Sequence, residues 1–240
     1  MEIIEYGDPD GIPLVVIPGT PEKASACAPF HESGVKHGLR LLCVTRPWYD
    51  DKSVEPSFDL VESQTIEYLK QRGIHGAFAL GGSGGGPFAL YLALKNDSIF
   101  KRCYLLASMG LPAPFVTHAK SSATRKLLEL FQGSNYSEWM SALGAWKVDS
   151  QHAHGAWADF SVLHGDWSKF NLDSACGVEI YHGKDDPNAP YESIQALAAL
   201  LRNVSWHITD DADHITMAQS DVPQIVDMIF GDVASAAAER

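Results

Sequence analysis

Apolar and polar positions along this chain form blocks that predict strands and helices in turn. Short apolar runs such as residues 12–17 are typical of buried strands, whereas longer stretches such as 58–72 repeat their apolar positions at helical spacing. The pattern predicts strands at 2–6, 12–17, 39–45, 76–80, 102–107, 178–182 and 204–209, and helices at 28–37, 58–72, 88–94, 191–202 and 222–230. Strands that alternate with helices in this way predict an α/β fold, with a mostly parallel sheet and helices on both of its faces.

Local signals near the two ends of the chain add two expectations. The sequence Asp8-Pro9-Asp10-Gly11 is rich in turn formers and predicts a hairpin between the first two strands. The segment 232–240 is polar and rich in alanine, and we expect it to fray.

Length and charge narrow the class of protein. A chain of 240 residues, 45% of them hydrophobic, fits one α/β domain with a modest insertion. The net charge of −12 opposes binding to nucleic acid or to anionic lipid. There is no run of eighteen apolar residues, and the N-terminus has no basic region, so we expect a cytoplasmic protein without a membrane span. A homodimer remains possible.

The four cysteines agree with a reducing compartment. Their positions show neither a pairing pattern nor the spacing of a metal site. We therefore interpret Cys27, Cys43, Cys103 and Cys176 as packing residues.

One glycine-rich turn carries the strongest chemical signal. Ser83 stands in Gly81-Gly82-Ser83-Gly84-Gly85-Gly86-Pro87, between an apolar strand-like stretch and a helical one. The pattern Gly-x-Ser-x-Gly at a strand-to-helix turn is that of a nucleophile elbow, in which small neighbours let the strand and the helix approach each other. A flexible glycine linker is the alternative, but the flanking strand and helix argue against it.

Several motifs together carry a resemblance to a known family. They are Tyr6-Gly7-Asp8-Pro9-Asp10-Gly11, Pro18-Gly19-Thr20-Pro21, Thr45-Arg46-Pro47 and Ser83-Gly84-Gly85-Gly86-Pro87. This combination resembles the cofactor-independent bacterial serine hydrolases of the α/β-hydrolase superfamily. The resemblance implies the α/β-hydrolase fold and a Ser-Asp-His triad without a cofactor. The family's usual first strand is absent before Met1, so we expect about seven strands.

The resemblance assigns the acid and the base. Gly183-Lys184-Asp185-Asp186-Pro187-Asn188-Ala189-Pro190 resembles the family's acid turn, in which the acid stands three residues after the glycine and four before the proline. Both counts give Asp186, with Asp185 as the alternative. His214 follows the strand 204–209 and is the expected base, whereas His207 lies inside that strand.

The oxyanion hole needs two backbone N–H groups. One is expected from Gly84, directly after the nucleophile. Pro18-Gly19-Thr20-Pro21 resembles the family's His-Gly-x-Pro segment, which would place the second N–H on Thr20. Pro18 replaces the usual histidine, which normally supports the loop and does no chemistry.

The separation between Ser83 and Asp186 indicates an inserted segment. One strand-helix-strand step needs only about thirty residues, and we assign residues 111–175 to a helical cap, with 1–110 and 176–240 forming the core. The cap is rich in aromatic side chains, most of which helical docking would explain. The expected substrate-pocket residues are Trp139, Trp146 and Trp157 of the cap and Trp48 of the core, for which covering its own loop is the alternative role.

The same insertion raises the question of a metal site. It contains His152, His154, Asp159, His164 and Asp166. The His-x-His spacing does not place two ligands on one helix face, and the expected chemistry needs no metal, so we predict none.

Three functions remain open. The first is hydrolysis of an ester or related acyl bond of a moderately apolar small molecule, with Ser83 as the nucleophile. The second uses the same triad for a lyase reaction or for hydrolysis of a carbon–carbon bond. The third is a non-catalytic small-molecule binder on the same fold.

Overall fold

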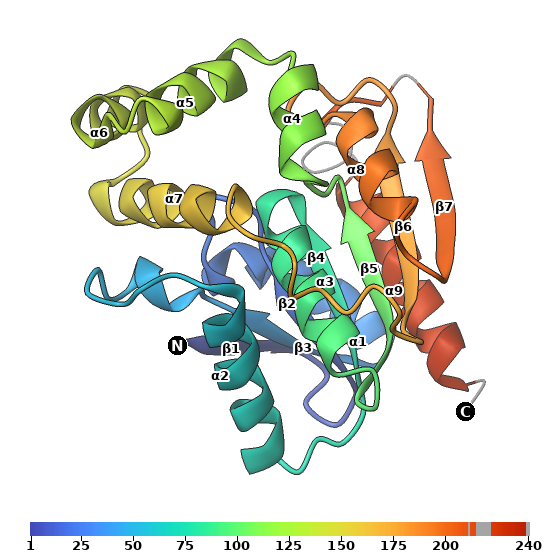
Figure 1. Ribbon diagram of the computed structural model, residues 1–240. Helices are drawn as coiled ribbons and strands as arrows, with labels where there is room; N and C mark the ends of the chain where they lie inside the picture. Colours follow the sequence, from blue (N-terminus) through green and yellow to red (C-terminus); the bar gives the residue numbers. More distant parts are fainter. Residues whose placement is uncertain (211, 215–221, 239–240) are drawn as a thin grey trace.

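The computed structural model describes residues 1–210, 212–214 and 222–238, and within these residues a seven-stranded sheet forms the centre of the molecule (Figure 1). The strands are β1 (Ile3–Gly7), β2 (Ile12–Ile17), β3 (Leu39–Val44), β4 (Ala77–Gly82), β5 (Phe100–Leu106), β6 (Gly177–Gly183) and β7 (Val204–Thr209). They lie in the order β1-β3-β2-β4-β5-β6-β7, and only β1 pairs antiparallel with its neighbour. The predicted mostly parallel sheet is confirmed.

The expected hairpin between the first two strands is wrong. The turn itself forms, since the N–H of Gly11 donates to the carbonyl of Asp8 at 3.0 Å. However, β3 lies between β1 and β2 and pairs with both. The N–H of Asp8 donates to the carbonyl of Leu39 at 2.8 Å, so the turn folds over the start of β3. A turn signal fixes the local chain reversal but not which strands pair.

Helices cover both faces of the sheet because successive side chains of each strand point to opposite faces. In β2, Val15 and Ile17 belong to the core cluster under α2 (Phe58–Gln71), α3 (Gly86–Lys95) and α8 (Tyr191–Ala198). Leu14 and Val16 belong to the opposite cluster, under the short helix η1 (Ala24–Phe30) and α9 (Val222–Ala238). Helix α1 (His31–Lys36) packs beside β1, β3 and α9 on this second face.

Several helix boundaries differ from the expected ones. The expected fraying after residue 232 is wrong, because α9 continues to Ala238 and buries Val233 and Ala236 against the sheet. Helix α8 ends at Ala198 instead of 202, and a 3₁₀ helix precedes α1. Buried contacts at the end of α9 supply the stability that the local composition does not indicate.

Four helices stand between β5 and β6: α4 (Pro112–His118), α5 (Ser122–Gln132), α6 (Tyr136–Ala145) and α7 (Ser150–Leu163). Figure 1 shows α5, α6 and α7 stacked at one end of the sheet, with α7 closer to it. Helix α7 begins after Asp149, whose carboxylate accepts the N–H groups of Gln151 and His152 at 2.9 and 3.0 Å.

Helices α5, α6 and α7 share a small apolar core of their own. It contains Leu130, Trp139, Leu143, Ala153 and Ala156. The division of the chain at 111–175 remains a prediction. Over the described ranges, no helix is both long and apolar enough to cross a bilayer.

Candidate active site

The candidate site lies where parallel strands end. Ser83 directly follows β4, Asp186 follows β6, and His214 comes five residues after β7. Because the carboxyl ends of parallel strands meet at one edge of a sheet, residues that are far apart in sequence come together there. Ser83 and His214 line the same cavity.

Ser83 occupies a tight turn between β4 and α3. Its φ of 48° lies in the left-handed region that side chains other than glycine rarely adopt. A Cβ placed on Gly81 would come within 2.6 Å of the Cα of Gly86, so only glycine lets the strand and the helix cross so closely. The backbone conformation that the glycine pattern predicts is therefore present, and it exposes the serine at the turn.

The acid turn holds Asp186 with groups of its own loop. The side chain is inaccessible to solvent, and Oδ1 accepts the N–H groups of Asn188 at 2.9 Å and Ala189 at 2.8 Å. Oδ2 lies 2.7 Å from Nδ1 of His214. Asp185, the alternative acid, is exposed to solvent.

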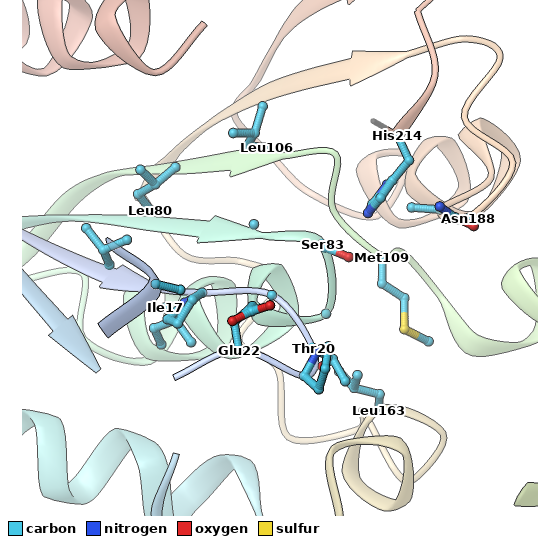
Figure 2. Close-up of a pocket in the computed structure, with 18 of the residues that line it drawn as sticks. Ile17, Thr20, Glu22, Leu80, Ser83, Leu106, Met109, Leu163, Asn188 and His214 are labelled. Carbon is cyan, nitrogen blue, oxygen red and sulfur yellow. The ribbon is translucent and has the colours of Figure 1, made fainter. Parts of the chain in front are cut away.

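The contact with Asp186 fixes the tautomer of a neutral His214. A carboxylate can only accept, so Nδ1 carries the proton and Nε2 is left as the acceptor. Figure 2 shows the His214 ring directed towards Ser83 across the cavity. Asp186 thus holds the ring on one side, and the ring faces Ser83 from the other.

Sequence reasoning missed a second histidine next to the acid turn. Nε2 of His182, in β6, donates to the carbonyl of Ala189 at 2.8 Å. Burial lowers the pKa of His182, so the ring stays neutral. Ala189 thus contacts His182 through its carbonyl and Asp186 through its N–H. The position of His182 inside an apolar strand did not indicate this contact.

The loop after β2 lies against the nucleophile turn. A Cβ placed on Gly19 would be 3.1 Å from the Cβ of Ser83, and one placed on Gly84 would collide with the hydroxyl of Thr20. Thr20, Ser83 and Gly84 all line the cavity. The two residues expected to form an oxyanion hole are therefore neighbours beside Ser83.

A buried ion pair lies behind this loop, and sequence reasoning missed it too. Arg46, after β3, and Asp159, in α7, are both inaccessible to solvent, with Nε to Oδ1 at 2.8 Å and Nη2 to Oδ2 at 2.9 Å. Burial opposes the charge of the guanidinium, but the attraction of Asp159 holds the pKa of Arg46 above its ordinary value.

Three more side chains donate to the Asp159 carboxylate. Trp48 Nε1 donates to Oδ1 at 2.9 Å, while the hydroxyls of Tyr49 and Thr20 each donate to Oδ2 at 2.6 Å. Burial, and then the negative charge of Asp159, raise the pKa of Tyr49 well above its ordinary value. A carboxylate that receives this many donors has its buried charge well compensated.

The cavity beside Ser83 has a volume of about 470 Å³ and a mainly apolar wall. Its larger apolar side chains include Phe30, Leu106, Met109, Phe115, Leu127, Phe160 and Leu163. Asn188, Thr124 and Glu22 add polar groups, and Figure 2 shows Glu22 and Asn188 on different sides of Ser83. Residues of α4, α5 and α7 therefore contribute to the wall.

The four tryptophans expected at the pocket do not line this cavity. Trp48 is buried and donates to Asp159. Trp139 is also buried, and its indole donates to the carbonyl of Ala153 at 2.9 Å. Trp157 packs edge-on against Trp139, and Trp146 is 45% exposed. Phe160, one turn after Trp157 on α7, and Phe115 on α4 take wall positions instead.

The residues considered for a metal site have other partners. His152 contacts Asp149, His154 contacts Tyr136, Asp159 binds Arg46, Asp166 accepts from Ser168, and His164 packs among Phe115, Phe131 and Phe160. Within residues 1–210, 212–214 and 222–238, no three His, Cys, Asp or Glu side chains gather as a metal site would require. All four cysteines are buried and unpaired, as expected for packing residues.

Comparison with protein-family models and with curated protein sequences gives no match. Solved structures do match over nearly the whole chain. MGS-M2, an alpha/beta hydrolase enzyme from a Medee basin deep-sea metagenome library, has a TM-score of 0.72 at 15% identity, covering 98% of this chain and 94% of that chain. The esterase EaEST from Exiguobacterium antarcticum has a TM-score of 0.68 at 16% identity, with the same coverage of 98% and 94%.

A third match has a different chemistry in its name. The meta-cleavage product hydrolase CumD from Pseudomonas fluorescens IP01 has a TM-score of 0.68 at 15% identity, again covering 98% and 94% of the two chains. At such identities the likeness shows the fold, which is that of the α/β hydrolases. The fold predicted from the sequence is thereby confirmed.

Proposed function

We propose that this chain, which has the α/β-hydrolase fold, is a serine hydrolase that cleaves an ester or related acyl bond of a moderately apolar small molecule. The observation that carries the proposal is the contact of 2.7 Å between Asp186 and His214, with Ser83 in a left-handed turn on the same cavity. A simple binder needs neither a strained serine nor a histidine held in one tautomer.

In the first half of the reaction, Oγ of Ser83 attacks the carbonyl carbon of the substrate while Nε2 of His214 accepts the hydroxyl proton. Asp186 stabilises the imidazolium that forms and keeps its orientation. The tetrahedral intermediate then collapses, and the leaving alcohol takes the proton from His214. An acyl group is left on Ser83.

In the second half, water attacks the acyl carbon and gives a proton to His214. Ser83 leaves with that proton, and the carboxylic acid is released. In both halves the former carbonyl oxygen becomes negative. We assign its stabilisation to the backbone N–H groups of Thr20 and Gly84, which are neighbours beside Ser83.

The cavity wall supports a substrate with an apolar acyl or aryl group. Phe115 and Phe160 come from the helices between β5 and β6, as does Leu127. We propose that residues 111–175 act as the cap that selects the substrate, with phenylalanine and leucine as the selecting side chains. The tryptophans expected in that role have structural contacts instead.

A fluorophosphonate probe tests the nucleophile and its base. It should label Ser83 in the folded wild-type protein and fail to label the His214→Ala variant, because an unassisted serine hydroxyl is a poor nucleophile. Heat-unfolded wild type is the control for non-specific labelling. Equal labelling of the wild type and His214→Ala would contradict the assignment of the base.

A second candidate reaction shares the triad. CumD, which has the same fold, is named as a meta-cleavage product hydrolase, and we keep carbon–carbon bond hydrolysis as the second candidate. A panel of aryl esters with acyl groups of increasing length separates the candidates. Rapid turnover with a clear length optimum supports the esterase, whereas labelling by the probe without ester turnover favours the second reaction.

A further inference from the structure

We propose that Asp159, in helix α7, is a positioning residue for the oxyanion hole and acts through the hydroxyl of Thr20. The proposal rests on the function proposed above. It adds a residue of the inserted helices that touches no substrate but sets the direction of the Thr20 N–H. Thr20 and Asp159 are 139 residues apart in the sequence and 2.6 Å apart in the fold.

The contact fixes the side chain of Thr20. Because a carboxylate can only accept, the Thr20 hydroxyl must donate its single proton to Asp159. Threonine is branched at Cβ and has few allowed side-chain rotamers. Fixing Oγ1 therefore also restricts the backbone of Thr20, including the direction of its N–H.

Arg46 restricts the same peptide from its other side. Its Nη2 donates to the carbonyl of Gly19 at 3.1 Å, and its Nη1 donates to the carbonyl of Pro18 at 2.6 Å. The carbonyl of Gly19 and the N–H of Thr20 belong to one planar trans peptide, so they point in opposite directions. Binding that carbonyl to Arg46 directs the N–H away from the guanidinium.

Asp159 joins both contacts, since it accepts from Arg46 as well as from Thr20. The buried carboxylate of Asp159 thus holds the Thr20 side chain directly and the Gly19–Thr20 peptide through Arg46. It follows that the helices between β5 and β6 affect the chemical step and not only the entry of substrate. Displacement of α7 would release Thr20 and leave one of the two N–H donors misaligned.

Tyr49 offers a matched control. Its hydroxyl also donates to Oδ2 of Asp159 at 2.6 Å and accepts from Nη2 of Arg46 at 3.1 Å, but Tyr49 is not part of the oxyanion loop. Thr20→Val and Tyr49→Phe each remove one hydroxyl from the same carboxylate oxygen and keep the shape of the side chain. If the network were purely structural, both variants would be less stable than the wild type, and kcat would change equally in both.

The test compares kcat for an aryl ester, normalised to the number of sites that a fluorophosphonate labels. We expect Thr20→Val to lower kcat about 10- to 100-fold with little change in KM, because the loss is in transition-state alignment. Tyr49→Phe should lower the melting temperature and leave kcat within about twofold. Thr20→Ser, which restores a hydroxyl, should recover most of the loss.

Two outcomes overturn the proposal while leaving the proposed function intact: equal kcat changes in Thr20→Val and Tyr49→Phe, or no change in either. If wild type itself shows neither labelling nor ester turnover, the proposed function fails, and this proposal fails with it. Asp159→Asn should lose at least as much kcat as Thr20→Val. Should that variant not fold, the comparison of the two hydroxyls decides alone.

Discussion

The acid turn and the oxyanion loop lie on the same edge of the sheet but are held in different ways. Asp186 accepts two N–H groups from residues two and three positions further along its own turn. The loop of Thr20 instead depends on Arg46, after another strand, and on Asp159, from helix α7. One element of the proposed site is stabilised within its own turn, and the other by residues that are distant in the sequence.

This difference predicts how each element fails. A local hydrogen-bonded turn keeps its shape when distant parts of the protein loosen. A loop that depends on a buried ion pair changes whenever either partner moves, and breaking such a pair leaves an uncompensated charge. Substitutions on α7 should therefore affect the oxyanion hole before they affect the acid.

The largest effect is expected at the acid itself. Asp186→Asn should lower kcat by roughly 10⁴-fold if the fold is kept, because His214 then loses the partner that fixes its tautomer. Asp185→Asn, in an exposed neighbour, is the matched control and should change kcat little. Steady-state kinetics on one aryl ester measure both, and reversed effects would show that Asp185 is the acid.

The next effect is on the oxyanion loop. Gly84→Ala places a methyl group against the Thr20 hydroxyl, and we expect kcat to fall by about 10²- to 10³-fold, as for the loss of one oxyanion donor. Gly82→Ala is the control, because its methyl group would meet only the carbonyl of Leu106 at 3.9 Å. Similar losses in both variants would mean that the glycine turn, and not its contact with Thr20, is being disturbed.

The buried pair should dominate the stability of the non-local element. Arg46→Met should reduce the free energy of unfolding by about 3–5 kcal/mol, because Asp159 would remain buried without its counter-charge. Lys36→Met removes an exposed ion pair with Asp227 and should change the free energy of unfolding little. Urea unfolding measures both, and equal costs would contradict the special role of the buried pair.

The smallest expected effect concerns pH. His164 ends α7 among aromatic rings, and burial lowers its pKa to about 4. The unfolded chain binds a proton below about pH 6.5 while the folded state stays neutral, so this residue's contribution to stability falls as the pH drops from about 6.5 towards 4.

The variant His164→Phe isolates that contribution. Its melting temperature should fall less than that of the wild type over the same pH range, by about 2–4 °C for each 1 kcal/mol involved. Parallel curves for the two proteins would show that the α7 end does not sense acid through His164.

The local element was predictable from the sequence for the same reason that it is stable on its own. Gly183, Asp186 and Pro190 lie within eight residues, and their spacing predicts Asp186 as the acid; the glycines around Ser83 predict the turn. The order of strand and helix blocks gave the sheet and its helical layers.

What the sequence could not give is the pairing of distant segments. The amino-acid sequence of β1 does not indicate that β3, and not β2, is its neighbour in the sheet. In the sequence, Arg46 was visible only as part of a motif and Asp159 only as one member of a rejected metal set, because their contact spans 113 residues. The tryptophans looked suited to a pocket because composition does not tell which face of a helix is turned to substrate.

One measurement tests the central claim most directly: mass spectrometry of the protein quenched during turnover of a p-nitrophenyl ester. The account predicts that the acyl group is found on the peptide that contains Ser83, and that Ser83→Ala shows neither the adduct nor catalytic turnover. An adduct on another residue, or a Ser83→Ala variant that hydrolyses the ester as fast as the wild type, would contradict it.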